Sequence, residues 1–448
     1  MKRFRPAVTL ALALAAGSAF GWSNHTVPTY RALEQMPQVA HAAAATVEPL
    51  AAFLKSEEKA LQALLASQEI WAAANVEKYP ARPSALAFVA DAARSDAARQ
   101  LAFLHALRVA PNSRFALYLQ PDPRHPLNGT PMAYSAVNTL PEQPDSDRVF
   151  IALKAGDKVA PLAVIASAAD EPDYGLDINL WQDSPSEWGK VYGFGKLPFG
   201  NPALYFATQA PFHMGFFHES RILYMAAPFI ARTFPHLRAH QFSTLAAFAF
   251  RTGHPYWGWR FAGLSLHYLQ DLTQPYHASL APGNSTLKLL WINALAMMGM
   301  TSQKDDMIVL LSNRHLALEK YQHELMHDAA LDSSSDTPIE KALHDISQDN
   351  SYPAWSDRYL RDVVSAQSWA AAPQLTETLI ATLPAHYVSD PSFDFGVNES
   401  GISLVRELAT QDAAKRARLD QALAQLLRNF GAHSRNALRG ILKAGQQE

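Results

Sequence analysis

Histidines and a carboxylate recur at ligand-like spacing in GLSLHYLQDLTQPYHAS, residues 263–279. His267 and Asp271 are four residues apart, so a helix presents both on one face. Pro275 interrupts that helix, and His277 follows on the exit turn. Nitrogen and oxygen donors without thiolate suit a zinc ion. The alternative is structural: His267 and Asp271 form an i,i+4 pair and His277 caps the helix end.

A second helical stretch, SNRHLALEKYQHELMHDAA, holds two further patterns. His315 and Glu319 are again four residues apart. HELMH, from His323 to His327, matches the HExxH pattern of zinc proteases. A protease also needs a third ligand, and here no HxxGxxH extension follows, which leaves the distant Glu340. The other histidines of this stretch also fit a solvated helix face.

The N-terminal segment predicts export and a chain that starts at Trp22. Basic residues precede an apolar run, residues 7–16, and Ala19 and Gly21 then form the small-x-small pattern that signal peptidase accepts. The run is shorter than the roughly 18 to 20 residues that span a bilayer. Residues 1–21 are therefore predicted to be a cleaved signal peptide, with the protein periplasmic or secreted.

A chain starting at Trp22 would offer an unusual pair of metal donors. Its free amine and its carbonyl oxygen can bind one metal ion as a five-membered chelate, and His25 follows three residues later. The site would then form only after the leader is removed. The alternative is that Trp22 simply packs in the core.

Composition sets limits on the class of protein. The chain has no cysteine, so an exported protein of this size depends on core packing or on metal for stability. With 48% hydrophobic and 18% charged residues, it is globular. A net charge of −3 gives the chain as a whole no field for binding polyanions.

The residue pattern predicts a mostly α fold. Helical spacing of charges dominates residues 30–108, and short β-prone runs separated by loop signals occupy 112–166. Residues 173–215 are rich in Gly, Pro, Asp and aromatics, which is typical of a long functional loop. Helical patterns return near 217 and continue to the end. Residues 22–448 are predicted to form one large helical domain.

These features together resemble the zinc-dependent phospholipase C and S1/P1 nuclease superfamily. Its members begin their mature chains on Trp and carry H-x3-D-x5-H, which here reads His267, Asp271 and His277. The flanking LSLHYLQDLTQPYHA is especially similar to the bacterial phospholipase C branch. The resemblance implies a helical domain with three zinc ions in a cleft. The segment before Asp173 is longer than in compact members, which implies a small α+β insertion at about 30–165.

The resemblance also implies the ligands of two zinc ions. The amine and carbonyl of Trp22, with His25, would hold the first ion. His267 and Asp271 would hold the second, and the Asp271 carboxylate would bridge the two ions.

The remaining implied ligands come from both sides of the H-x3-D motif. The third zinc would take three ligands: His277, His315 and Glu319. Asp173 from EPDYG and His213 from APFHMGFFHE complete the set, with His218 as the alternative to His213.

The chemistry implied by the resemblance is hydrolysis of a phosphodiester. Zinc ions neutralise phosphate oxygens and lower the pKa of a bound water to about 7. Asp173 is the expected catalytic base. Metal-binding imidazoles must be neutral, so activity should fall as the pH drops through about 6.5.

Phospholipid headgroups are the first expectation for the substrate, with transient contact to a membrane surface and a monomeric protein. The alternatives are an S1/P1-like nuclease acting on single-stranded nucleic acid, an HExxH protease, and an exported binding protein whose metals are only structural. Four aromatic residues near the motif either line the cleft or belong to the core: Trp257, Trp259, Tyr268 and Tyr276.

Residues 285–302, STLKLLWINALAMMGMTS, are apolar on both faces and carry Lys288 as their only charge. The segment is too short to span a bilayer. A helix with this pattern is normally buried. If the substrate is a membrane lipid, the alternative is an interfacial element with Trp291 at headgroup level.

Overall fold

The computed structural model describes residues 22–142, 146–331, 336–410 and 412–447. The chain is 61% helix and 2% strand, which confirms the prediction of a mostly α fold. The predicted signal peptide, residues 1–21, lies outside the described residues. Within the described ranges, no helix combines the length and the apolar character that crossing a bilayer requires.

The secondary structure elements follow one another along the chain with few strands between the helices. The α-helices are α1 (Thr26–Leu33), α2 (Pro37–Ala40), α3 (Leu50–Ser56), α4 (Glu58–Asn75), α5 (Asp96–Leu107), α6 (Tyr134–Val137), α7 (Pro161–Ala169), α8 (Glu187–Val191), α9 (Ala210–His213), α10 (Arg221–Ala226), α11 (Pro235–Arg251), α12 (Pro255–Asp271), α13 (Pro275–Ala278), α14 (Thr286–Met297), α15 (Ser302–Leu331), α16 (Pro338–His344), α17 (Ala366–Thr382), α18 (Ala385–Val388), α19 (Phe395–Asn398), α20 (Leu404–Ala409) and α21 (Ala413–Gly445). Short helices of other types are η1 (Ser84–Leu86), η2 (Glu171–Tyr174), η3 (Tyr205–Gln209), η4 (Pro228–Ala231), η5 (Asp349–Ser351) and the π-helical η6 (Leu360–Ser365). The strands are β1 (Ala45–Thr46), β2 (Tyr118–Leu119), β3 (Ile151–Ala152) and β4 (Lys158–Val159).

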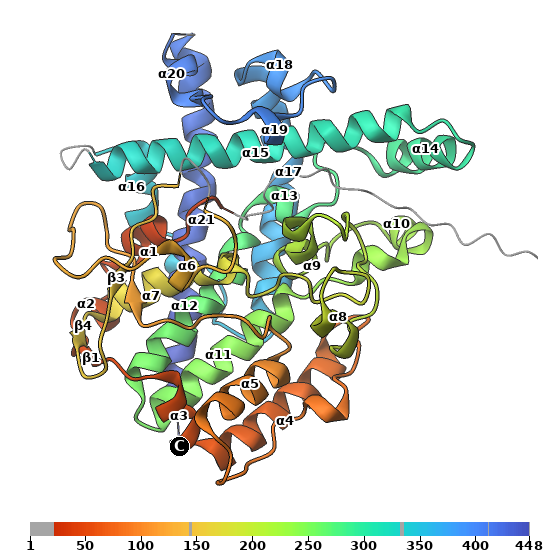
Figure 1. The fold of residues 1–448 in the computed structure, drawn as a ribbon. Helices are drawn as coiled ribbons and strands as arrows, with labels where there is room; N and C mark the ends of the chain where they lie inside the picture. The colour runs from red at the N-terminus through yellow and green to blue at the C-terminus, as the bar shows by residue number, and fades with distance from the viewer. Residues whose placement is uncertain (1–21, 143–145, 332–335, 411, 448) are drawn as a thin grey trace, which may run out of the picture.

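Helix α12 runs through the middle of the body, and α7, α11 and α21 pack against it (Figure 1). Pro255 occupies the first turn, where the missing N–H costs nothing. Every residue from Tyr256 to Asp271 is buried. Because α12 is enclosed on all sides, the polar side chains near its end face the protein interior.

Gly263 lets α7 approach α12 closely. A Cβ built at this position would lie 2.4 Å from the carbonyl oxygen of Ile165 and 2.7 Å from the Cβ of Ala168. Only glycine leaves room for this contact. The end of α7, including the carbonyl group of Ala169, therefore lies beside the turn of α12 that carries His267.

The segment at 30–165 combines helices with two small antiparallel ladders. Strand β1 pairs with β4, and β2 pairs with β3. Three of these strands lie in the region 112–166, where the sequence predicts short strands. Helices α3 and α5 pack together, and α4 packs on α11, so this segment covers one side of the helical core.

Helix α15 is 30 residues long and lies across one side of the body, with α14 packed near its N-terminal end (Figure 1). Of the two alternatives for residues 285–302, burial of the whole helix does not hold for one face of α14. Leu287 is 77% exposed and Trp291 is 61% exposed. The other face is buried through Ile292 and Leu295.

Candidate metal centre

Buried histidines and carboxylates gather in three groups whose ligand atoms lie within 4.8 Å of one another inside each group. The groups are His25, Asp173 and His267; His213, His267 and Asp271; and His277, His315 and Glu319. Eight of the nine predicted ligands thus come together, from the residue before α1 and from η2, α9, α12, α13 and α15. His218, the alternative to His213, instead faces the carbonyl oxygen of Arg361 at 2.8 Å.

Two histidine rings of the centre are held by carbonyl oxygens. His267 Nδ1 donates to Ala169 O at 2.7 Å, and His277 Nδ1 donates to His213 O at 2.7 Å. Because Nδ1 carries the proton in each ring, Nε2 keeps its lone pair and faces the other ligand atoms. Metal-binding histidines typically show this arrangement.

His25 is fixed in the same way at the start of α1. Its Nδ1 donates to Gln270 Oε1 at 2.9 Å, and its backbone N–H donates to Asp170 Oδ1 at 2.9 Å. Nε2 lies 3.3 Å from Asp271 Oδ1 and has no hydrogen-bond partner. Gln270 and Asp170 were not predicted from the sequence, although Gln270 directly precedes Asp271 and is fully buried.

The Asp271 carboxylate lies between two of the groups. Oδ1 faces His25 Nε2, whereas Oδ2 lies 2.9 Å from His213 Nδ1 and 3.3 Å from His267 Nε2. Burial opposes ionisation of this carboxyl, but the surrounding histidines outweigh that effect and hold its pKa well below the usual range. One oxygen thus points to each group, which is the geometry that a bridging carboxylate requires.

Asp173 is a buried carboxylate without a hydrogen-bond donor on either oxygen. Oδ1 lies 3.6 Å from His267 Nε2 and 3.7 Å from His213 Nδ1. Burial raises the pKa of this carboxyl to about 6. An ionised carboxylate in such a place needs a compensating cation nearby.

The third group combines His277 from α13 with His315 and Glu319 from α15. His315 Nε2 lies 3.1 Å from His277 Nε2 and 2.5 Å from Glu319 Oε1. Burial lowers the pKa of both histidines to about 3, so at neutral pH both rings are in the uncharged form that binds metal. Gln274 Nε2 donates to Glu319 Oε1 at 3.3 Å, and the ring of Tyr276 stacks on that of His315.

Asp177 is a further carboxylate that the sequence analysis did not single out. Its Oδ2 accepts from the hydroxyl of Tyr268 at 2.6 Å and lies 3.6 Å from His213 Nε2. Its Oδ1 accepts from Arg238 Nε at 2.9 Å, so this carboxylate already has a cation. Asp177 therefore orients His213 from outside the three groups. The one indication of this role in the sequence was the position of Asp177, four residues after the predicted ligand Asp173.

Trp22 lies beside the centre with its side chain buried. The indole Nε1 donates to Gln270 O and to Thr273 Oγ1, both at 3.1 Å, and the ring meets Phe430 edge-on. The side chain therefore packs in the core. The use of the Trp22 amine and carbonyl as ligands stays a prediction, because it depends on residues 1–21, which the structure does not describe.

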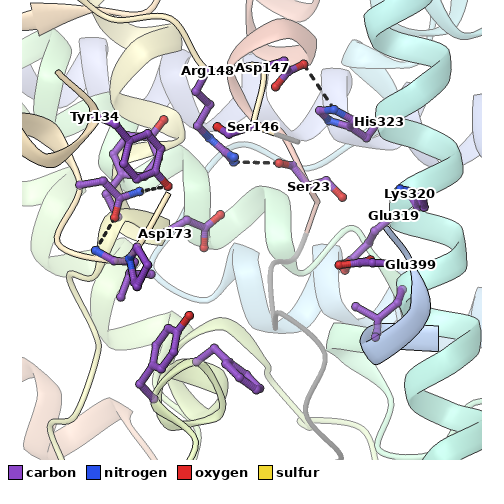
Figure 2. Close-up of a pocket in the computed structure, with 18 residues that line it drawn as sticks. Ser23, Tyr134, Ser146, Asp147, Arg148, Asp173, Glu319, Lys320, His323 and Glu399 are labelled. Atoms are coloured by element: carbon purple, nitrogen blue, oxygen red, sulfur yellow. Dashed lines mark hydrogen bonds and ion pairs between the residues drawn. The ribbon is translucent and has the colours of Figure 1, made fainter. Parts of the chain in front are cut away.

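A cavity of about 270 Å³ reaches the centre, and Asp173 and Glu319, from two different groups, both line it. In Figure 2, Asp173 lies on one side of the cavity, and Glu319 and Lys320 lie on the other. The remaining wall includes Tyr134, Tyr205 and Arg148. Arg148 donates to Asp170 Oδ2 at 2.9 Å, so this arginine braces the loop that holds His25.

The aromatic residues predicted near the motif belong to the core. None of them lines the cavity, and their side chains are between 0% and 6% exposed: Trp257, Trp259, Tyr268 and Tyr276. The aromatic wall of the cavity comes instead from Tyr134, Tyr174, Tyr205 and Phe206. The sequence could not reveal this wall, because these residues lie far from the H-x3-D motif along the chain.

The HELMH stretch lies on α15 outside the three groups. His323 Nε2 and His327 Nε2 lie 3.3 Å and 3.9 Å from the same oxygen of Asp147. Glu324, the base of an HExxH protease, instead accepts from the N-terminal residues of α20. Glu340, the distant candidate ligand, pairs with arginines. This geometry gives the protease alternative no support.

The donor set fits a bound cation. Within the described residues, several buried ligand atoms of the centre lack a hydrogen-bond partner: His25 Nε2, both oxygens of Asp173, and Asp271 Oδ1. No lysine or arginine of the described ranges forms an ion pair with Asp173 or Asp271. Buried polar atoms normally have partners, and metal ions would supply them here.

The fold and the centre define a mostly helical protein with three adjoining groups of potential metal ligands. The chain matches no model of a known protein family, no curated protein and no solved structure.

Proposed function

We propose that the protein is a zinc-dependent phosphodiester hydrolase of the phospholipase C type, exported and acting on phospholipid headgroups. One observation carries the proposal: three groups of potential metal ligands adjoin one another, and a carboxylate from each of two of them, Asp173 and Glu319, lines a single cavity. Nitrogen and carboxylate donors without thiolate favour zinc in a hydrolytic site. Three zinc ions are proposed: one held with His25, one held by His267, and one held by His277, His315 and Glu319, with the Asp271 carboxylate between the first two.

The chain's own residues have distinct tasks in this proposal. Bound zinc ions would neutralise phosphate oxygens and activate water. Asp173 has no hydrogen-bond donor and faces the cavity, so it accepts the proton of the water that attacks phosphorus. Asp170 and Gln270 hold His25 in place, and the carbonyl of Ala169 holds His267.

The cavity favours a phospholipid headgroup over a nucleic acid strand. A cavity of about 270 Å³ accommodates a small phosphodiester. The wall combines tyrosine rings with the carboxylates Asp147 and Glu399, a combination that suits a cationic headgroup such as choline. Nucleases acting on single strands instead use a basic groove that follows several phosphates.

The test compares two substrates on zinc-loaded protein. We expect release of phosphate ester from lecithin to exceed cleavage of single-stranded DNA by at least ~100-fold. Asp173→Asn should lower lecithin hydrolysis by about 100-fold or more, the usual contribution of a general base. Asp183→Asn, an exposed carboxylate ten residues along, serves as the control and should stay active.

Two results would contradict the proposal. DNA cleavage without lecithin hydrolysis would identify a nuclease. Absence of both activities in protein that holds its zinc would favour the structural role of the metals.

A further inference from the structure

Helices α10 and α14, which contact each other, and the residues just after α14 expose large apolar side chains, here called the α10–α14 surface. Seven side chains contribute, each between 51% and 77% exposed: Ile222, Met225, Leu287, Trp291, Met297, Met298 and Met300. Single exposed apolar residues are ordinary, but clusters of this kind mark interaction surfaces.

The two helices are packed firmly beneath this surface. Leu223 of α10 and Ile292 of α14 are buried, and both line a small apolar space between the helices and α15. Ser220 Oγ and Thr286 Oγ1 lie 3.2 Å apart at the start of the two helices. Figure 1 shows α10 and α14 near one end of α15. The exposed apolar side chains therefore project from helices whose inner faces are packed against the rest of the protein.

The charges of the two helices have one sign. Arg221 is the only charged residue of α10, Lys288 is the only one of α14, and both are exposed. Glu219, just before α10, accepts a backbone N–H and lies partly buried. The nearest exposed acids in sequence, Asp305 and Asp306, are on α15. Apolar residues flanked by cations complement a surface that carries phosphates above hydrocarbon.

We propose that the α10–α14 surface docks the protein on a phospholipid bilayer. Trp291 and the methionines enter the headgroup region, while Arg221 and Lys288 meet lipid phosphates. The choice of lipid as the partner rests on the proposed function. His315 lies 13 residues from the first residue of α15, so a single helix joins the surface to the metal centre over roughly 20 Å.

A second copy of the chain is the less suitable occupant. A two-fold interface would bring the same surface of both copies together. The two copies of Arg221 and Lys288 would then meet with no carboxylate on α10 or α14 to neutralise them. A bilayer provides phosphates at that place.

The experiment is flotation of the full protein with vesicles of phosphatidylcholine containing a minor fraction of phosphatidylserine. We expect the wild-type protein to float with the vesicles and Leu287→Asp/Trp291→Asp to lose about tenfold or more in vesicle affinity. Hydrolysis of a soluble short-chain phosphodiester should be the same in both proteins. Ile70→Asp, a 73% exposed residue on α4, is the matched control and should float like the wild type.

The remaining outcomes separate the two proposals. Wild-type protein that stays out of the floating fraction would overturn docking, as would a double variant that floats equally well or one with a lowered melting temperature. A dimer that the double variant abolishes, without flotation, would identify a second copy as the occupant. Flotation without hydrolysis of lecithin or of the soluble phosphodiester would support docking and contradict the proposed function.

Discussion

At the scale of single residues, hydrogen bonds to one ring nitrogen orient three histidines of the centre. Oxygen acceptors fix Nδ1 of His25, His267 and His277, so each Nε2 is directed before any metal binds. These acceptors are backbone carbonyl oxygens and the side chain of Gln270, which occupies an unspecified position of the H-x3-D motif. The spacing H-x3-D could predict the ligands, but it could not predict the hydrogen-bond acceptors that orient the histidine rings.

The position of Asp271 between two groups leads to a prediction about metal content. Asp271→Asn keeps the size of the side chain and removes the negative charge that faces both groups. We expect two zinc ions to be weakened together and hydrolysis to fall sharply. Metal analysis by mass spectrometry measures this directly. A variant that retains every zinc ion with normal turnover would disprove bridging.

Lys320 leads to a prediction about substrate binding. This half-buried lysine lines the cavity next to Glu319 and has no ion-pair partner within the described ranges. A phosphate oxygen would be a natural partner for its ammonium group. Lys320→Ala should raise KM for a phosphodiester about tenfold, the effect of ~1.4 kcal/mol, with zinc content unchanged. The exposed Lys59→Ala is the control. An unchanged KM would exclude this role.

At the scale of helices, the approach of α7 to α12 decides whether His267 meets its acceptor. Periodicity in the sequence predicts α12 and the shared face of His267 and Asp271. The helix that packs against α12 at this point could not be predicted. A glycine at position 263 indicates that another segment approaches closely, but it does not indicate which segment. For the same reason, the roles of Asp177 and Ala169 follow from packing between segments far apart in the chain.

Gly263→Ala tests this contact. The added methyl group would lie 2.4 Å from a backbone oxygen of α7, so the two helices must separate. We expect a loss of about 1–3 kcal/mol in the free energy of unfolding and weaker binding of the zinc ion that His267 holds. Thermal unfolding and metal titration measure the two effects. A variant with wild-type stability would show that α7 and α12 are not tightly apposed.

At the scale of the whole molecule, the centre draws its ligands from widely separated parts of the chain. Residues near position 25 meet α12, and α15 contributes from beyond position 300. The sequence could predict the individual ligand pairs and the helical class. It could not predict the cavity wall, where Tyr134, Tyr205 and Glu399 come from separate segments.

The predicted start of the chain at Trp22 leads to a test on the intact protein. One extra residue before Trp22 would convert the free amine into an amide, which is a poor metal donor. We expect such protein to lose one zinc ion and most of its activity, whereas protein beginning at Trp22 keeps both. Full zinc content in the extended protein would exclude the N-terminal ligand.

The central claim is that three zinc ions occupy the centre, and anomalous scattering at the zinc absorption edge tests it most directly. Crystals of zinc-loaded protein that begins at Trp22 should show three strong peaks. One peak should lie near His25 and Asp271, one near His267 and Asp271, and one among His277, His315 and Glu319. Peaks only at His323 and His327, or no peak within the buried groups, would contradict the account.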